Sequence, residues 1–71
     1  MNKMLLHITK ASLSSVANDI EVLCEKIRRD YLTAVSDEYV DVLKTVLSCL
    51  EVLKFYIHGK LFEVEVKIYE S

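Results

Sequence analysis

The chain has 71 residues, of which 52% are hydrophobic, and it carries a net charge of −2 with acidic and basic residues interspersed. This length allows one small domain, residues 1–71, whose own core is marginal because a chain of this size buries only about 60% of its unfolded surface. The charge balance does not favour nucleic acid or an anionic membrane surface as the partner.

The N-terminal segment, residues 3–9, is compatible with a short strand or with the lead-in to a helix. Alternation places Met4, Leu6 and Ile8 on one face, although Leu5 fits poorly on the opposite, more polar face. Such alternation is typical of a half-buried strand. We therefore predict a short strand here and keep the helical lead-in as the alternative.

A first helix is predicted over residues 12–35. Thr9 or Ser12 can serve as its N-cap, and apolar residues then recur at helical spacing. This stripe comprises Leu13, Val16, Ala17, Ile20, Leu23, Cys24, Ile27, Tyr31, Ala34 and Val35. Charged and polar residues occupy the opposite face, so we expect one packed side and one exposed side.

A second helix, residues 37–58, has the clearest signals in the chain. Ser36 suits the N-cap, and Asp37 and Glu38 follow where the helix dipole favours negative charge. Gly59, the only glycine, is expected to end the helix. Apolar residues surround most of this helix and leave a narrow polar strip. No proline or glycine separates the two helices, so the connection must be short and the helices antiparallel neighbours.

The last segment, residues 61–69, alternates with a period of two. Phe62, Val64, Val66 and Ile68 fall on one side and Glu63, Glu65 and Lys67 on the other. This pattern predicts a half-buried strand, which must pair with residues 3–9, with a second copy or with another protein. The predicted fold class is α+β, mostly α: an antiparallel two-helix hairpin with a C-terminal strand and, where residues 3–9 pair, an N-terminal one.

The high apolar fraction and the small core lead us to expect self-association. Small domains usually add disulfides, a metal or a partner chain to a marginal core. We expect a homodimer with a four-helix core. The predicted self-association surface comprises Leu43, Val46, Leu50, Leu53 and Ile57 from the second helix and Phe62, Val64, Val66 and Ile68 from the strand.

No sequence pattern in this chain is typical of catalysis, and we expect a protein that is not an enzyme. Ser12, Ser14 and Ser15 lack the GxSxG turn of a hydrolase nucleophile and suit helix capping or a solvated surface. A chain with one glycine cannot form a glycine-rich phosphate loop. The paired carboxylates, such as Glu21 with Glu25, are expected to be exposed, where they make poor general acids.

We also expect no metal and no cofactor. Cys24 and Cys49 share no recognisable spacing with each other or with His7 and His58, so we interpret both cysteines as buried small hydrophobic residues with reduced thiols. The N-terminal apolar run is too short for a signal peptide, and no uncharged run approaches the ~20 residues that cross a bilayer. We expect a cytoplasmic protein that does not bind membranes.

Two hypotheses of function remain. The first is non-catalytic binding or regulation of another protein by the homodimer, as small inhibitors, antitoxins or accessory proteins of mobile elements do. The second is DNA binding, because the order strand-helix-helix resembles that of the ribbon-helix-helix repressors, and Lys26, Arg28 and Arg29 form a small basic cluster. The slightly acidic charge and the long first helix favour the first hypothesis.

Overall fold

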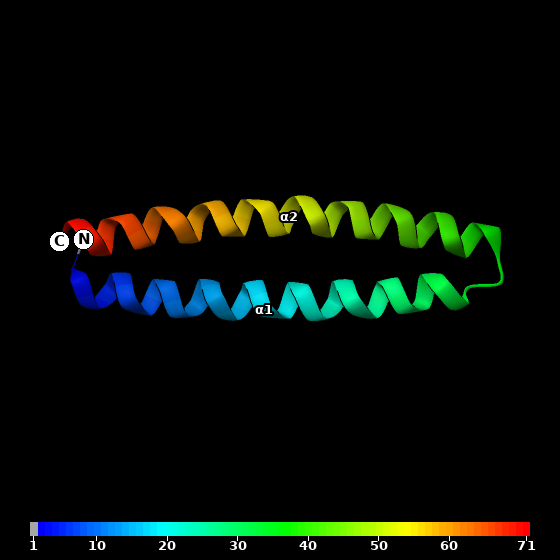
Figure 1. The fold of residues 1–71 in the computed structure, drawn as a ribbon, viewed down its shortest axis with the longest axis horizontal. Helices are drawn as coiled ribbons and strands as arrows, with labels where there is room; N and C mark the ends of the chain where they lie inside the picture. Colours follow the sequence, from blue (N-terminus) through cyan, green and yellow to red (C-terminus); the bar gives the residue numbers. More distant parts are fainter. Residues whose placement is uncertain (1) are drawn as a thin grey trace.

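The computed structural model describes residues 2–71 and consists of two long antiparallel helices (Figure 1). Helix α1 spans Lys3–Thr33 and helix α2 spans Asp37–Glu70. The two chain ends therefore lie side by side at one end of the molecule. The molecule measures 52 × 15 × 12 Å, and its radius of gyration is 16.1 Å. A compact domain of this length has a radius of gyration of about 11 Å, so the hairpin is a rod in which each helix packs only against the other.

Local hydrogen bonds define where each helix begins. The Asn2 side chain accepts a hydrogen bond from the Met4 N–H at 2.7 Å and caps α1. The Ser36 hydroxyl accepts one from the Tyr39 N–H at 3.4 Å and caps α2, whose first turn holds Asp37 and Glu38. The predicted cap of the second helix is therefore confirmed, and so are the short connection and the antiparallel hairpin.

The predicted α+β class is wrong. Within residues 2–71 the structure contains no strand, because residues 3–9 form the first turns of α1 and residues 61–69 lie inside α2. The first helix runs over Lys3–Thr33 instead of residues 12–35. The second continues past residue 58 and through Gly59, which was expected to end it, as far as Glu70. The fold is all-α.

The C-terminal segment is helical because it continues the contact face of α2. Ile57, Leu61, Val64 and Ile68 are spaced four, three and four residues apart, and all four are half-buried. This spacing keeps them on one side of a helix, toward α1. Phe62 and Val66 are exposed. The apparent period of two arose because two helical stripes, 62 and 66 on one face and 64 and 68 on another, interleave in the sequence.

The N-terminal segment follows the same principle. Leu6 is buried, whereas Met4 and Ile8, which a strand would place beside it, are exposed. Leu6 lies seven residues before Leu13 and fourteen before Ile20, so it begins the contact face of α1. A strand at this position would leave backbone groups without partners, whereas the helix satisfies them internally.

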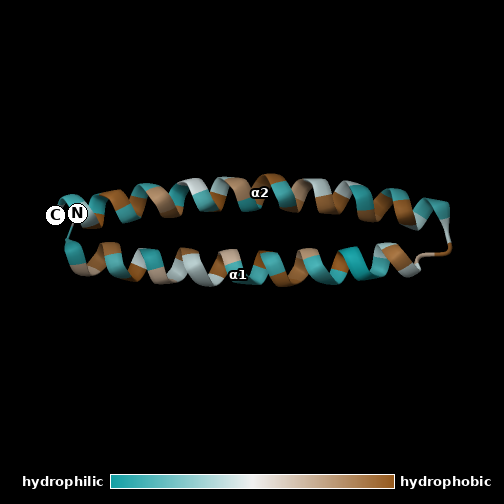
Figure 2. Cartoon of the chain, viewed as in Figure 1, coloured by the Kyte–Doolittle hydropathy of each residue, from teal (hydrophilic) through white to brown (hydrophobic). Residues whose placement is uncertain are grey.

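The contact faces of the two helices meet in one continuous seam with alternating spacings of three and four, as in a coiled coil. From α1 the seam takes Leu6, Lys10, Leu13, Ala17, Ile20, Cys24, Ile27 and Tyr31, and from α2 Val40, Leu43, Leu47, Leu50, Lys54, Ile57, Leu61, Val64 and Ile68. Cys24 is fully buried. Colouring by hydropathy shows hydrophobic residues at many other places on both helices (Figure 2). The core is therefore one layer thick and holds only part of the apolar side chains.

Replacing Ile20 by alanine tests the seam. Ile20 is buried against α2, so Ile20→Ala should lower the free energy of unfolding by about 2–5 kcal/mol. Val22 lies two residues away on the exposed side of the same helix, and Val22→Ala should change the free energy by less than about 0.5 kcal/mol. Urea unfolding followed by circular dichroism measures both values. Equal losses in the two variants would contradict the seam.

Candidate protein-interaction surface

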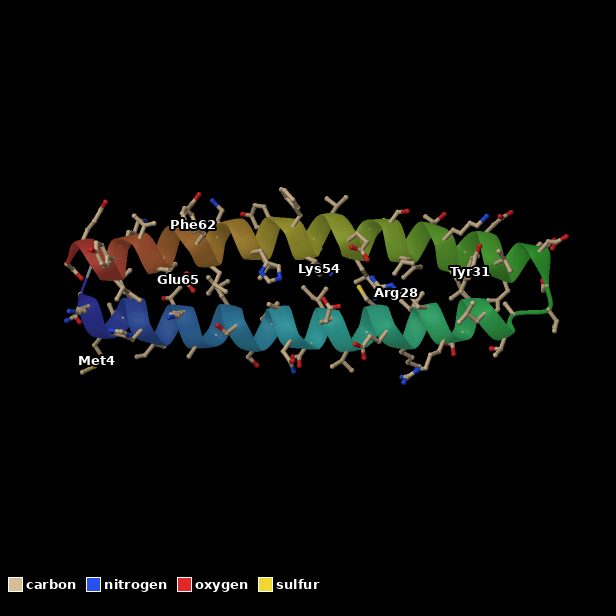
Figure 3. The ribbon with its side chains drawn as sticks, in the orientation of Figure 1. Met4, Arg28, Tyr31, Lys54, Phe62 and Glu65 are labelled. Atoms are coloured by element: carbon tan, nitrogen blue, oxygen red, sulfur yellow. The ribbon has the colours of Figure 1, made fainter. Side chains whose placement is uncertain are left out.

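The two edges of the seam differ in chemistry, and one of them carries the ion pairs between the helices. Glu21 and Arg28 directly follow the seam residues Ile20 and Ile27 in α1, and Glu51 directly follows Leu50 in α2. Arg28 pairs with Glu51, and Glu21 pairs with Lys54 at 2.9 Å. Lys10 lies 3.9 Å from Glu65 near the chain ends. Figure 3 shows Arg28, Lys54 and Glu65 in the region between the two helices. We call this side the ion-pair edge.

Lys54 is a seam residue whose ammonium group reaches the ion-pair edge. All other seam residues of α2 are apolar. The Lys54 side chain is 27% exposed, and its ammonium group also lies 3.8 Å from Glu51. The hydrogen bond between Lys54 and Glu21 lowers the pKa of Glu21 and raises the pKa of Lys54. Exposed ion pairs contribute little to stability. A charged residue inside a seam, however, specifies the register of the helices, since only one alignment places Lys54 beside Glu21.

The predicted basic cluster is divided between two faces of α1. Arg28 is held by Glu51 on the ion-pair edge, whereas Lys26 and Arg29 lie three residues apart on the exposed side. A ribbon-helix-helix architecture also requires an N-terminal strand, and residues 3–9 are helical. The structural premise of the DNA-binding hypothesis is therefore wrong for the part of the chain that the structure describes.

The other edge of the seam is mostly apolar in the half of the rod nearer the loop, where Asp30, directly before Tyr31, is its charged member at the loop end of α1. Val16 and Leu23 directly precede the seam residues Ala17 and Cys24 in α1, so they lie opposite the ion-pair edge. In α2 the same place lies directly before the seam residues Val40, Leu47 and Lys54, and it is held by Tyr39, Val46 and Leu53. These five side chains are between 38% and 46% exposed. We call them the apolar edge. Val42, Cys49 and Tyr56, also exposed, widen it on the outer side of α2.

The nine residues predicted to form the self-association surface lie in three places. Leu43 is buried in the seam against α1, and Leu50, Ile57, Val64 and Ile68 are half-buried there. Val46 and Leu53 lie on the apolar edge, and Phe62 and Val66 lie on the outer side of α2.

Sequence reasoning did not assign Val16, Leu23, Tyr39, Val42, Cys49 and Tyr56 to a contact surface between copies. The signal for the α2 members is a second series with spacings of three and four, from Tyr39 to Tyr56, beside the seam. The interpretation of both cysteines as buried is confirmed for Cys24 and wrong for Cys49, which is exposed.

An open groove lies on the ion-pair edge beside the loop. Its volume is about 550 Å³, and Arg28, Tyr31, Leu32, Lys44, Leu47 and Ser48 line it. The Lys44 ammonium lies 6.0 Å from the centre of the Tyr31 ring, within the range of a weak cation–π contact. The groove thus has an apolar floor and a cationic rim.

Among residues 2–71, no three histidine, cysteine or acidic side chains come together in a way that could hold a metal ion. Over the same residues, neither helix has a stretch that is apolar over enough length to cross a membrane. Comparison with protein-family models, with curated proteins and with solved structures found no match.

The Glu21–Lys54 pair predicts a specific pH dependence of stability. Because the folded-state pKa of Glu21 is lowered, its contribution is present above the unfolded-state pKa and is lost as the pH falls through the folded-state pKa. Glu21→Gln should therefore make the melting temperature fall less than in the wild type between about pH 5 and pH 3. Thermal unfolding at low salt measures this difference.

Lys54→Met is the matched control, because it removes the cation that lowers the pKa of Glu21. It should reduce the acid sensitivity as Glu21→Gln does, and the double variant should show no further reduction. A Glu21→Gln variant with the wild-type pH dependence would show that the pair does not contribute.

Proposed function

We propose that this chain is a non-catalytic protein-interaction module that acts as a homodimer, in which the apolar edges of two hairpins pack together. The observation that supports this proposal most directly is the half-exposed row Val16, Leu23, Tyr39, Val46 and Leu53, which runs along the side of the seam where the described residues form no ion pairs between the helices. Two hairpins joined along this row would enclose it in a four-helix core.

The area of the isolated hairpin supports the same proposal. Its accessible surface is 5420 Å², whereas a compact protein of this length exposes about 4,500 Å². The excess of about 900 Å² is close to the ~800 Å² that each partner buries in a standard interface. The hairpin as a whole therefore exposes enough extra surface for one interface of standard size.

The apolar edge also has defined limits. The row beside the seam in α2 begins with Tyr39, Val46 and Leu53 and continues toward the C-terminus with Lys60 and Lys67. The outer row Val42, Cys49 and Tyr56 continues with Glu63. Charged residues at the boundary and apolar or aromatic residues inside it are typical of protein interfaces. The proposed contact therefore covers the half of the rod nearer the loop.

The groove beside the loop is the surface through which we propose that the dimer binds its target protein. The groove lies on the ion-pair edge, so it stays open when the apolar edges pack together. Leu32 is 81% exposed at this groove, next to the Tyr31 ring. Arg28 and Tyr31 at this groove are of the residue types that are enriched among the energetically dominant residues of protein interfaces, and Leu32 adds exposed apolar surface beside them. Regulation by binding, as in small inhibitors or antitoxins, is the activity that this arrangement supports best.

Leu53→Asp tests the homodimer. A carboxylate on the apolar edge would be buried in the dimer, so the substitution should halve the mass of the assembly while the hairpin stays helical. Val22→Asp places the same charge at an exposed apolar position elsewhere on the hairpin and should leave the mass unchanged. Sedimentation equilibrium gives both masses. An unchanged mass for Leu53→Asp would refute the apolar-edge dimer.

Leu32→Asp tests the target-binding groove. An affinity-tagged wild-type dimer should recover one protein in stoichiometric amount from its native source, and the Leu32→Asp dimer should recover at least tenfold less of it. The Val22→Asp dimer should recover as much as the wild type. Equal recovery by the wild type and Leu32→Asp would place target binding elsewhere.

A further inference from the structure

A third apolar stripe runs along the outer side of α2, apart from the seam and the apolar edge. It consists of Val52, Phe55, Gly59, Phe62, Val66 and Tyr69, with alternating spacings of three and four. Phe55 is 84% exposed, Phe62 67% and Tyr69 93%. Figure 3 shows Phe62 pointing away from α1. We call this set the outer stripe; neither the hairpin nor the apolar-edge dimer covers it.

Gly59 lies at the centre of the outer stripe, and nothing inside the chain accounts for a glycine there. Its backbone is helical and its φ is not positive. Apart from its chain neighbours and the adjacent backbone of its own helix, a Cβ atom at Gly59 would meet no atom within 4 Å. A glycine in the middle of a helix lowers helix stability relative to alanine. A glycine is useful at this position only if a group outside the chain packs closely against the α2 backbone.

We propose that the outer stripe is a second self-association interface, in which the α2 helices of two copies cross at Gly59. The stripe is nearly symmetric about this residue, because Val52 and Val66 each lie seven residues away and Phe55 and Phe62 lie four before and three after. A two-fold axis at Gly59 therefore sets Val52 of one copy against Val66 of the other, and Phe55 beside Phe62. Such self-complementarity is what a two-fold interface requires.

Area and charge both agree with a second copy as the occupant. The exposed parts of the three aromatic rings amount to roughly 500 Å², a large share of the ~800 Å² that each partner buries in a standard interface. Glu63, on the flank of the stripe, lies 3.5 Å from Lys60 of its own chain. Its charge is thus compensated within each copy and does not oppose the approach of another.

This inference goes beyond the apolar-edge dimer, because it adds a second interface on a different face of α2. Two distinct two-fold interfaces on one chain generate an assembly larger than a dimer, either a closed tetramer or an open chain of hairpins. The protein would then present several copies of its loop-side groove on one particle. Multiple copies of one binding site raise the overall affinity for a target that engages more than one of them.

Gly59→Leu tests the crossing. The leucine would project into space that is open in the hairpin but is taken by the partner helix at the crossing. Leucine is also a better helix former than glycine, so the melting temperature of the separated hairpin should not fall. Sedimentation equilibrium should show at least a twofold lower mass than the wild type. An unchanged mass for Gly59→Leu would overturn the proposal.

Three further variants help to separate this interface from the apolar-edge dimer. Phe62→Ser should lower the mass as Gly59→Leu does, and Gly59→Ala should raise the dissociation constant at least tenfold. Leu53→Asp combined with Gly59→Leu should give a helical monomer. If Leu53→Asp lowers the mass and Gly59→Leu does not, the crossing is refuted and the apolar-edge dimer stands. The reverse pattern would support the crossing and refute the apolar-edge dimer.

Discussion

A helix in a two-helix hairpin can cover only one narrow face of its neighbour, and this constraint governs the whole molecule. The seam takes one series of residues with spacings of three and four from each helix, and every apolar residue outside that series stays in contact with water. Helix α2 has far more apolar residues than its seam holds, among them Phe55 and Tyr69. Since burial contributes roughly 25 cal/mol per Å² of apolar surface, the exposed faces of α2 provide a strong drive for association.

The charged residues divide the hairpin into surfaces with different roles. Arg28 and Glu51 join the helices on one edge, and Lys54 with Glu21 sets their register, so this edge is already satisfied within the chain. Among the described residues, the opposite edge has no corresponding ion pairs between the helices along its apolar part, which includes Leu53. An interface that buried the first edge would have to desolvate ion pairs, whereas burial of the second removes mainly apolar surface from water.

Sequence reasoning predicted the features that depend on neighbouring residues. It failed for the features that depend on packing between segments far apart in the sequence. The Ser36 cap and the short connection were predictable, because each involves neighbouring residues. The continuation through Gly59 was not, because glycine and the alternation that follows it resemble a helix end and a strand. Leu61, in step with Ile57 and Val64, was the signal for a helix. Burial against α1 on both sides of Gly59 outweighs its cost of about 1 kcal/mol. Val16 could be assigned to the apolar edge only from the structure, because the ion pairs between the helices mark the other edge of the seam.

The measurement that tests the central claim most directly is the melting temperature of the wild-type chain over a hundredfold range of concentration. If copies packed on the exposed faces of α2 add stability to the single-layer hairpin, unfolding is coupled to dissociation, and the melting temperature should rise with concentration. A melting temperature that is independent of concentration would show that association adds no stability to the hairpin and would contradict the account.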